Sequence, residues 1–122
     1  MHKIEGKIIK VMLECLDGKR ACGEYTLSKR DSVEFTDGTV RYFLWSSNIF
    51  KVEKRQGRLR LEFSDNGYGT ITTHSRLKAL VNAFLLPDDS LCVRKGFLCK
   101  KDSRGTSLLC GLSVKNIFEV EE

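Results

Sequence analysis

Short turn signals separate segments in which apolar and polar residues alternate, and this arrangement constrains the fold more than any other feature of the chain. The signals are Asp17-Gly18, Asp37-Gly38 and Gln56-Gly57. A glycine in such a pair readily adopts the positive φ that a two-residue hairpin turn requires, and alternation with a period of two is typical of strands. Residues 1–65 are therefore predicted to form three consecutive β-hairpins.

The first two predicted hairpins differ in their faces. The leading strand of the first alternates Ile9, Val11, Leu13 and Cys15 with Lys10, Met12 and Glu14, and the return strand runs from Ala21 to Leu27. The exit strand of the second hairpin has large side chains on both faces: Val40, Tyr42 and Leu44 on one, and Arg41, Phe43 and Trp45 on the other. A strand of this kind is central in a sheet or lines a pocket.

One segment repeats its apolar residues with the period of a helix. Spacing at i, i+3, i+4, i+7 and i+8 gives a complete apolar stripe, formed by Leu77, Leu80, Val81, Phe84 and Leu85. We expect Thr73 or Ser75 to cap the N-terminus of this helix, and Pro87-Asp88-Asp89 to end it. The helix is therefore predicted at about residues 74–86.

After the helix the chain returns to β patterning. Alternation from Leu91 to Lys100 and an apolar run at 108–112 predict a C-terminal β-hairpin within residues 90–121. Asn48–Glu53 also matches Asn116–Glu121 at five of six positions, which indicates similar roles for the two segments. Together these patterns predict an α+β fold, mainly antiparallel β-hairpins with one central amphipathic helix, in a single domain spanning residues 1–122.

Composition and charge indicate where in the cell the protein is expected and which charge its partner should have. The 122 residues include 21 Lys and Arg against 16 Asp and Glu, a net charge of +5 that favours an anionic partner. Neither a secretory signal nor an apolar run of about 18 residues is visible, so a cytoplasmic location is expected, the host cytoplasm if a phage encodes the chain. The five cysteines are an odd number and are expected to be reduced thiols.

The sequence contains no recognisable catalytic or metal-binding set. No Cys-x-x-Cys occurs and His2 and His74 are the only histidines, so neither a metal nor a cofactor is expected. His74 lies between Thr73 and Ser75, where it fits a capping network better than a general base. Asp88-Asp89 falls in the turn that ends the predicted helix. These observations predict a binding protein rather than an enzyme.

Basic residues on the predicted strands have aromatic neighbours. An arginine beside an aromatic face suits a phosphate and a nucleobase. The candidate ligand-binding residues are therefore Phe84, Arg94, Arg104, Trp45 and Arg41. The helical spacing of Phe84 also fits a position in the apolar core.

Three kinds of partner fit these residues. The first is a small phosphorylated nucleotide in a pocket, often between the subunits of a homo-oligomer. The second is RNA or single-stranded DNA on a small β-barrel, because Val11–Arg20 is somewhat similar to an Sm-type first hairpin, although the second Sm motif is missing. The third is a protein that pairs with an exposed strand edge.

The layout of the chain favours the first kind of partner. Phe84 at the end of the helix is followed by Pro87-Asp88-Asp89 and the basic strand Val93–Gly96, within the segment Leu77–Gly96. In size, in its hairpin–helix–hairpin order and in this segment, the chain resembles the Thoeris anti-defence family of phage proteins, first type. The resemblance implies a non-enzymatic, oligomeric, β-rich protein that sequesters cyclic ADP-ribose-type immune signals and so counters a host defence.

Overall fold

Two helices and nine strands make up the computed structural model, which describes residues 3–86 and 90–121. In chain order they are α1 (Lys3–Leu16), β1 (Gly23–Thr26), β2 (Asp31–Thr36), β3 (Thr39–Leu44), β4 (Ser47–Arg55), β5 (Arg58–Phe63), α2 (Ile71–Phe84), β6 (Leu91–Arg94), β7 (Phe97–Asp102), β8 (Gly105–Gly111) and β9 (Asn116–Glu121). The predicted α+β class is confirmed, with two helices in place of one. Within the described ranges, neither helix is long and apolar enough to cross a membrane.

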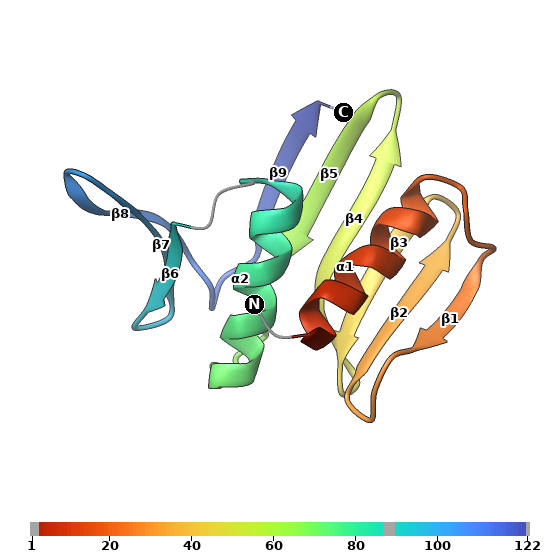
Figure 1. Cartoon of the computed structure of the whole chain (residues 1–122), viewed down its shortest axis with the longest axis horizontal. Helices are drawn as coiled ribbons and strands as arrows, with labels where there is room; N and C mark the ends of the chain where they lie inside the picture. Colours follow the sequence, from red (N-terminus) through yellow and green to blue (C-terminus); the bar gives the residue numbers. More distant parts are fainter. Residues whose placement is uncertain (1–2, 87–89, 122) are drawn as a thin grey trace.

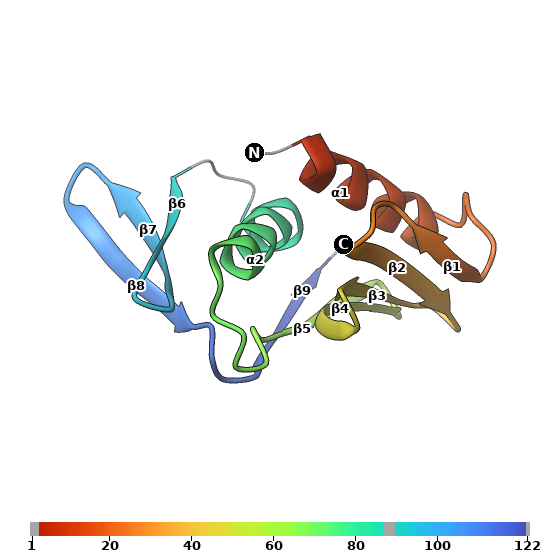
Figure 2. The same ribbon diagram turned by 90° about the horizontal axis from the view of Figure 1, so that it is seen from below.

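The strands form two antiparallel sheets (Figure 1). The larger has the order β1-β2-β3-β4-β5-β9, and the smaller has the order β6-β7-β8. Both helices cover one face of the larger sheet, and α2 lies between that sheet and the smaller one (Figure 2). We call the smaller sheet, Leu91–Gly111, the arm. Because β1 and β9 are separate edges of an open sheet, the described strands do not form the β-barrel considered above.

The N-terminal segment is a helix, and the hairpin predicted at Asp17-Gly18 is wrong. Ile8, Val11, Met12 and Cys15 are all buried, and their spacing is that of one helix face. The amide of Gly18 donates to Cys15 and that of Lys19 to Glu14, a Schellman helix end, with Gly18 at φ 75°. A helix end and a hairpin turn both need positive φ here, so the Asp-Gly pair fits either.

The other two predicted turns are confirmed. Asp37-Gly38 joins β2 to β3, and Gln56-Gly57 joins β4 to β5, with positive φ at both residues of each pair. A further pair of this kind, Lys95-Gly96, divides the strand predicted over Leu91–Lys100 into β6 and β7. The predicted C-terminal hairpin is therefore the three-stranded arm, followed by β9, which pairs with β5 of the larger sheet.

Helix α2 begins at Ile71, three residues before the predicted start. Its N-cap is Thr70, whose Oγ1 accepts the amide of Thr73 at 3.1 Å, so neither Thr73 nor Ser75 caps it. The apolar stripe is confirmed: Leu77, Leu80, Val81 and Phe84 are buried. The helix ends at Phe84 with Leu85 as C-cap, and the stop predicted at Pro87-Asp88-Asp89 lies outside the described residues.

The two matching segments of the sequence flank the same strand. Asn48–Glu53 lies in β4 and Asn116–Glu121 forms β9, and both strands pair with β5. Phe50 and Phe118 both stack on Phe63, and their ring centroids lie 5.6 Å and 5.8 Å, respectively, from that of Phe63. Their packing roles are therefore similar, although β4 is interior and β9 is an edge strand.

A buried ion network joins both helices to the sheet. Arg76 of α2 donates to Asp31 of β2 at 2.8 Å and to Glu5 of α1 at 2.9 Å. Tyr42 and Ser28 also donate to Asp31. Burial alone would raise the pKa of Asp31, but the hydrogen bonds from Arg76, Ser28 and Tyr42 together lower it. The network thus holds α2 over the end of β3 near which the candidate site lies.

Candidate functional site

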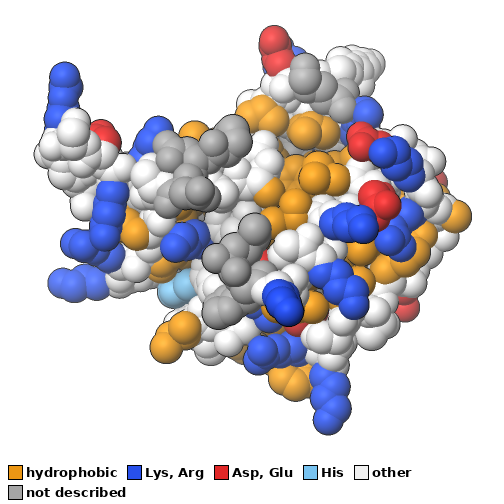
Figure 3. All heavy atoms as spheres, viewed as in Figure 1, with side chains coloured by type: hydrophobic (Ala, Val, Ile, Leu, Met, Phe, Trp, Pro, Cys, Tyr) orange, Lys and Arg blue, Asp and Glu red, His pale blue; other side chains and the backbone are white. Residues whose placement is uncertain are grey.

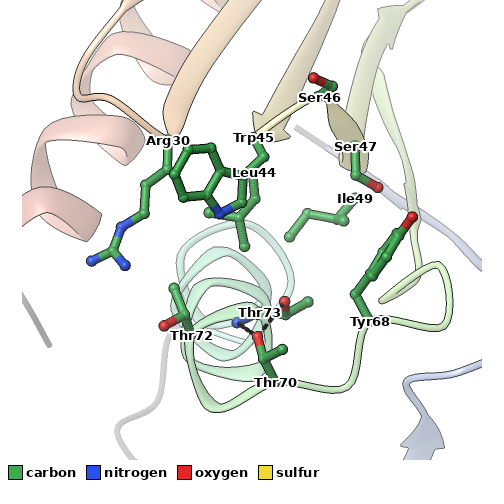
Figure 4. Close-up of a pocket in the computed structure, with 10 residues that line it drawn as sticks. All are labelled: Arg30, Leu44, Trp45, Ser46, Ser47, Ile49, Tyr68, Thr70, Thr72 and Thr73. Carbon is green, nitrogen blue, oxygen red and sulfur yellow. Dashed lines mark hydrogen bonds between the residues drawn. The ribbon is translucent and has the colours of Figure 1, made fainter.

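A cavity of about 650 Å³ opens between the start of α2 and the turn that joins β3 to β4 (Figure 4). This volume is within the range of about 300–1,000 Å³ that is typical of small-molecule sites. We call it the α2 cavity; it is lined by Arg30, Leu44, Trp45, Ser46, Ser47, Ile49, Tyr68, Thr70, Thr72 and Thr73. Segments far apart in the sequence therefore meet in one hollow.

Two exposed aromatic rings stand at this cavity. Trp45 is 67% exposed and Tyr68 is 63% exposed, and they lie on different sides of the hollow in Figure 4. Trp45 has φ 57°, a left-handed conformation that is an outlier for a bulky residue. Its amide donates to the carbonyl of Arg30 at 2.5 Å, which ties the turn to the start of β2. The two rings offer flat apolar faces to a heteroaromatic ligand.

The rest of the lining is mostly polar and includes a cation. Thr70, Thr72 and Thr73 surround the first turn of α2, where backbone amides have no partner within the helix and the helix dipole is positive. The Arg30 side chain is about half exposed, and its Nε lies 4.0 Å from the Asp31 carboxylate. Figure 4 shows Arg30 on the side of the cavity away from Tyr68. Guanidinium and helix start together favour an anionic group such as phosphate.

The loop that carries Tyr68 is attached to α2 through His74. Its Nε2 lies 3.1 Å from Oδ2 of Asp65, and Oδ1 of Asp65 accepts the amide of Gly67 at 2.9 Å. A Cβ on Gly69 would lie 3.6 Å from both Asp65 and His74, so the loop packs closely here. His74 therefore belongs to a polar network at the start of the helix, and that network positions Tyr68.

The five predicted ligand-binding residues do not come together. Trp45 lines the cavity. Phe84 instead lies in the core, 9% exposed and with its ring 5.8 Å from that of Phe50, so it is not part of the cavity lining. Arg41 alternates with buried residues of β3 and lies on the sheet face away from the helices, 3.4 Å from Glu34.

The remaining predicted residues lie on the arm, and the second ring and the cation of the cavity, Tyr68 and Arg30, were not predicted. Arg94 ends β6, and Arg104 is in the turn before β8. Tyr68 between two glycines was a visible signal, because an exposed loop offers no core to bury the ring. Arg30 had no comparable signal, since its place beside Trp45 depends on strand pairing.

Metal binding and thiol reactivity depend on how the His, Cys, Asp and Glu side chains are placed. Over residues 3–86 and 90–121, no group of three or more His, Cys, Asp or Glu could hold a metal ion. The five cysteines are free thiols. Burial raises the pKa of Cys15 and of Cys110, which keeps both thiols protonated at neutral pH.

Comparisons with protein-family models, with curated proteins and with solved structures found no match. The resemblance to the Thoeris anti-defence family stays a prediction. The interpretation of the α2 cavity therefore rests on the residues that line it.

Proposed function

We propose that the chain is a non-enzymatic protein that binds a small phosphorylated nucleotide in the α2 cavity. One observation carries the proposal: Trp45 and Tyr68 are exposed around the same hollow that Arg30 and the start of α2 make positive. A nucleobase stacks on an aromatic ring, and a guanidinium donates two parallel hydrogen bonds to a phosphate. The threonine and serine hydroxyls of the lining can bond ribose.

The proposal includes sequestration of a cyclic ADP-ribose-type signal, which would counter a host defence. Such ligands combine a purine, ribose hydroxyls and a pyrophosphate, and the lining offers a partner of suitable chemistry for each. Release without reaction is part of the proposal, because the described residues that line the cavity include no histidine, cysteine or carboxylate to act as a base or a nucleophile. A homo-oligomer is also expected, and native mass spectrometry measures it together with any retained ligand.

Titration calorimetry with cyclic ADP-ribose and with ADP tests this proposal. We expect Trp45→Asn and Arg30→Gln each to weaken binding at least about tenfold, the effect of losing about 1.4 kcal/mol of contact. Asparagine tolerates positive φ, so the first variant keeps the turn. Arg41→Gln is the matched control, since it removes an arginine from the opposite face and should leave affinity unchanged.

The nucleotide recovered after binding should be chemically intact, which chromatography determines. Absence of heat with both nucleotides would contradict the proposal. So would an Arg41→Gln variant that binds as weakly as Arg30→Gln, because binding would then depend on net charge alone.

A further inference from the structure

The net positive charge of the chain is concentrated in and beside the arm. Residues 90–111 contain five Lys and Arg but one acidic residue, so they hold four of the five net positive charges of the chain. The cations are Arg94, Lys95, Lys100, Lys101 and Arg104. Blue side chains gather accordingly over the arm, on the left of Figure 3. Such an asymmetry indicates a surface for an anionic partner.

Several cations of the larger sheet form ion pairs with acidic residues, whereas most of those on the arm form none with a described residue. Arg41 lies 3.4 Å from Glu34, and Lys51 lies 2.9 Å from Glu53. Four arm cations make no ion pair with any residue that the structure describes: Arg94, Lys95, Lys101 and Arg104. The arm therefore keeps its positive charge available to a polyanion.

An exposed aromatic ring lies among these cations. Phe97 is 42% exposed and lies directly opposite Arg94 in the pairing of β6 with β7, so both side chains are on one face. Lys101 is four residues further along β7 and shares that face. Phe97 and Val114 both lie within 4 Å of the Cβ position of Gly111, which extends the apolar surface beside the ring.

From this arrangement we infer that the arm binds single-stranded nucleic acid, an activity separate from the small-nucleotide site of the α2 cavity. Phe97 stacks on an unpaired base, and Arg94, Lys101 and Arg104 contact phosphates. Every base has a flat face, so this binding is tolerant of sequence. An acidic protein or an anionic membrane would satisfy the charge but would not use a flat ring beside an arginine in this way.

Fluorescence anisotropy with a labelled oligothymidylate measures this binding. With the three phosphate contacts of Arg94, Lys101 and Arg104, affinity should fall about 20-fold between 50 and 200 mM salt. The variant Arg94→Ser/Lys101→Ser removes two of these contacts, and its affinity should fall only about threefold over the same range. Arg55→Ser/Arg58→Ser removes the same charge from the turn between β4 and β5 and should keep the full salt dependence.

A second variant isolates the stacking. Phe97→Leu keeps an apolar side chain, so the arm should remain folded with an unchanged melting temperature. It should weaken oligothymidylate binding at least about fivefold and leave binding to heparin, a polyanion without bases, unchanged. Trp45→Asn in the α2 cavity should affect neither, so a failure of this inference is distinguishable from a failure of the proposed function.

Three results would each overturn the inference. One is an Arg55→Ser/Arg58→Ser variant that loses as much salt dependence as the arm variant. Another is a Phe97→Leu variant that binds heparin and oligothymidylate equally weakly. The third is a wild-type protein that does not bind oligothymidylate, whether or not it binds phosphatidylglycerol vesicles or an acidic polypeptide.

Discussion

Replacing Arg76 with methionine tests whether the buried network holds both helices on the sheet. The guanidinium donates to Asp31 at 2.8 and 3.4 Å and to Glu5 at 2.9 Å, and the three side chains are at most 3% exposed. Methionine fills much of the same space but removes these donors. Both carboxylates then remain buried and lose the guanidinium of Arg76, which costs about 3–5 kcal/mol.

This loss is a large part of the free energy of unfolding of the whole protein. A chain of 122 residues has a free energy of unfolding of about 6–18 kcal/mol. An unfolding entropy of about 0.26 kcal/mol per kelvin converts the loss into a fall of about 12–20 °C in Tm. In the control Arg41→Met, the pair with Glu34 is partly solvated, so Tm should fall by less than about 4 °C.

Thermal unfolding followed by circular dichroism measures both variants. Equal falls in Tm for Arg76→Met and Arg41→Met would refute the reasoning, because burial would then have no effect on the loss. A further variant, Arg76→Met with Asp31→Asn and Glu5→Gln, also removes the two buried negative charges. It should recover part of the lost stability, since the penalty arises from buried carboxylates that have lost the guanidinium of Arg76.

The pH dependence of the unfolding free energy shows whether Arg76→Met loses stability through its buried carboxylates or through lost packing. In the wild type the pKa of folded Asp31 is below its unfolded value, so its contribution is present above about pH 4 and is lost as the pH falls through the folded pKa. In Arg76→Met this pKa should rise, because Arg76 no longer opposes the effect of burial. The variant therefore has less of this contribution, and the difference in unfolding free energy should shrink as the pH falls through the folded pKa of Asp31. A constant difference would show that lost packing is responsible.

Two further predictions concern α1. Gly6 is inside the helix with open space around its Cβ position, so Gly6→Ala should stabilise by about 0.5–1 kcal/mol, whereas Gly18→Ala at φ 75° should destabilise by about 1–2 kcal/mol in urea unfolding. The two substitutions should change the free energy of unfolding in opposite directions. A loss of stability in both variants would contradict a helix that contains Gly6 and ends at Gly18. Exposed Cys22 should react with a thiol reagent much faster than buried Cys15, whose pKa is raised by burial. Equal rates in the folded protein would contradict the packing of α1.

The error at the N-terminus has a physical origin that the sequence itself contains. Val11 and Cys15 fit a period of two and a period of 3.6 equally well. The residues that distinguish the two are Ile8 and Met12, which are buried, and Leu13, which is 42% exposed. A helix needs Ile8 and Met12 on its buried face, whereas a strand would turn them away from Val11 and Cys15. Packing against the sheet decides between two patterns that local sequence leaves nearly balanced.

The hairpins of the larger sheet and the stripe of α2 followed from local rules, but most of the α2 cavity did not. Its cation, Arg30, lies beside Trp45 because Asp31 pairs with Leu44, which is a long-range contact. Tyr68 reaches the same hollow because Asp65 binds His74 across a loop. Local spacing carries no information on either contact, so sequence reasoning found one ring of the site and missed the cation.

The turn between β3 and β4 nevertheless held a local signal for the site. Three other hairpins of the described chain turn through a residue followed by glycine: Asp37-Gly38, Gln56-Gly57 and Lys95-Gly96. This turn uses Trp45-Ser46, and a tryptophan occupies a left-handed position that asparagine, aspartate or glycine fills at far less strain. The indole is mostly exposed, so little core packing compensates for that strain. A residue that breaks the turn rule without stabilising the fold is expected where function requires it, and the break occurs at the wall of the α2 cavity.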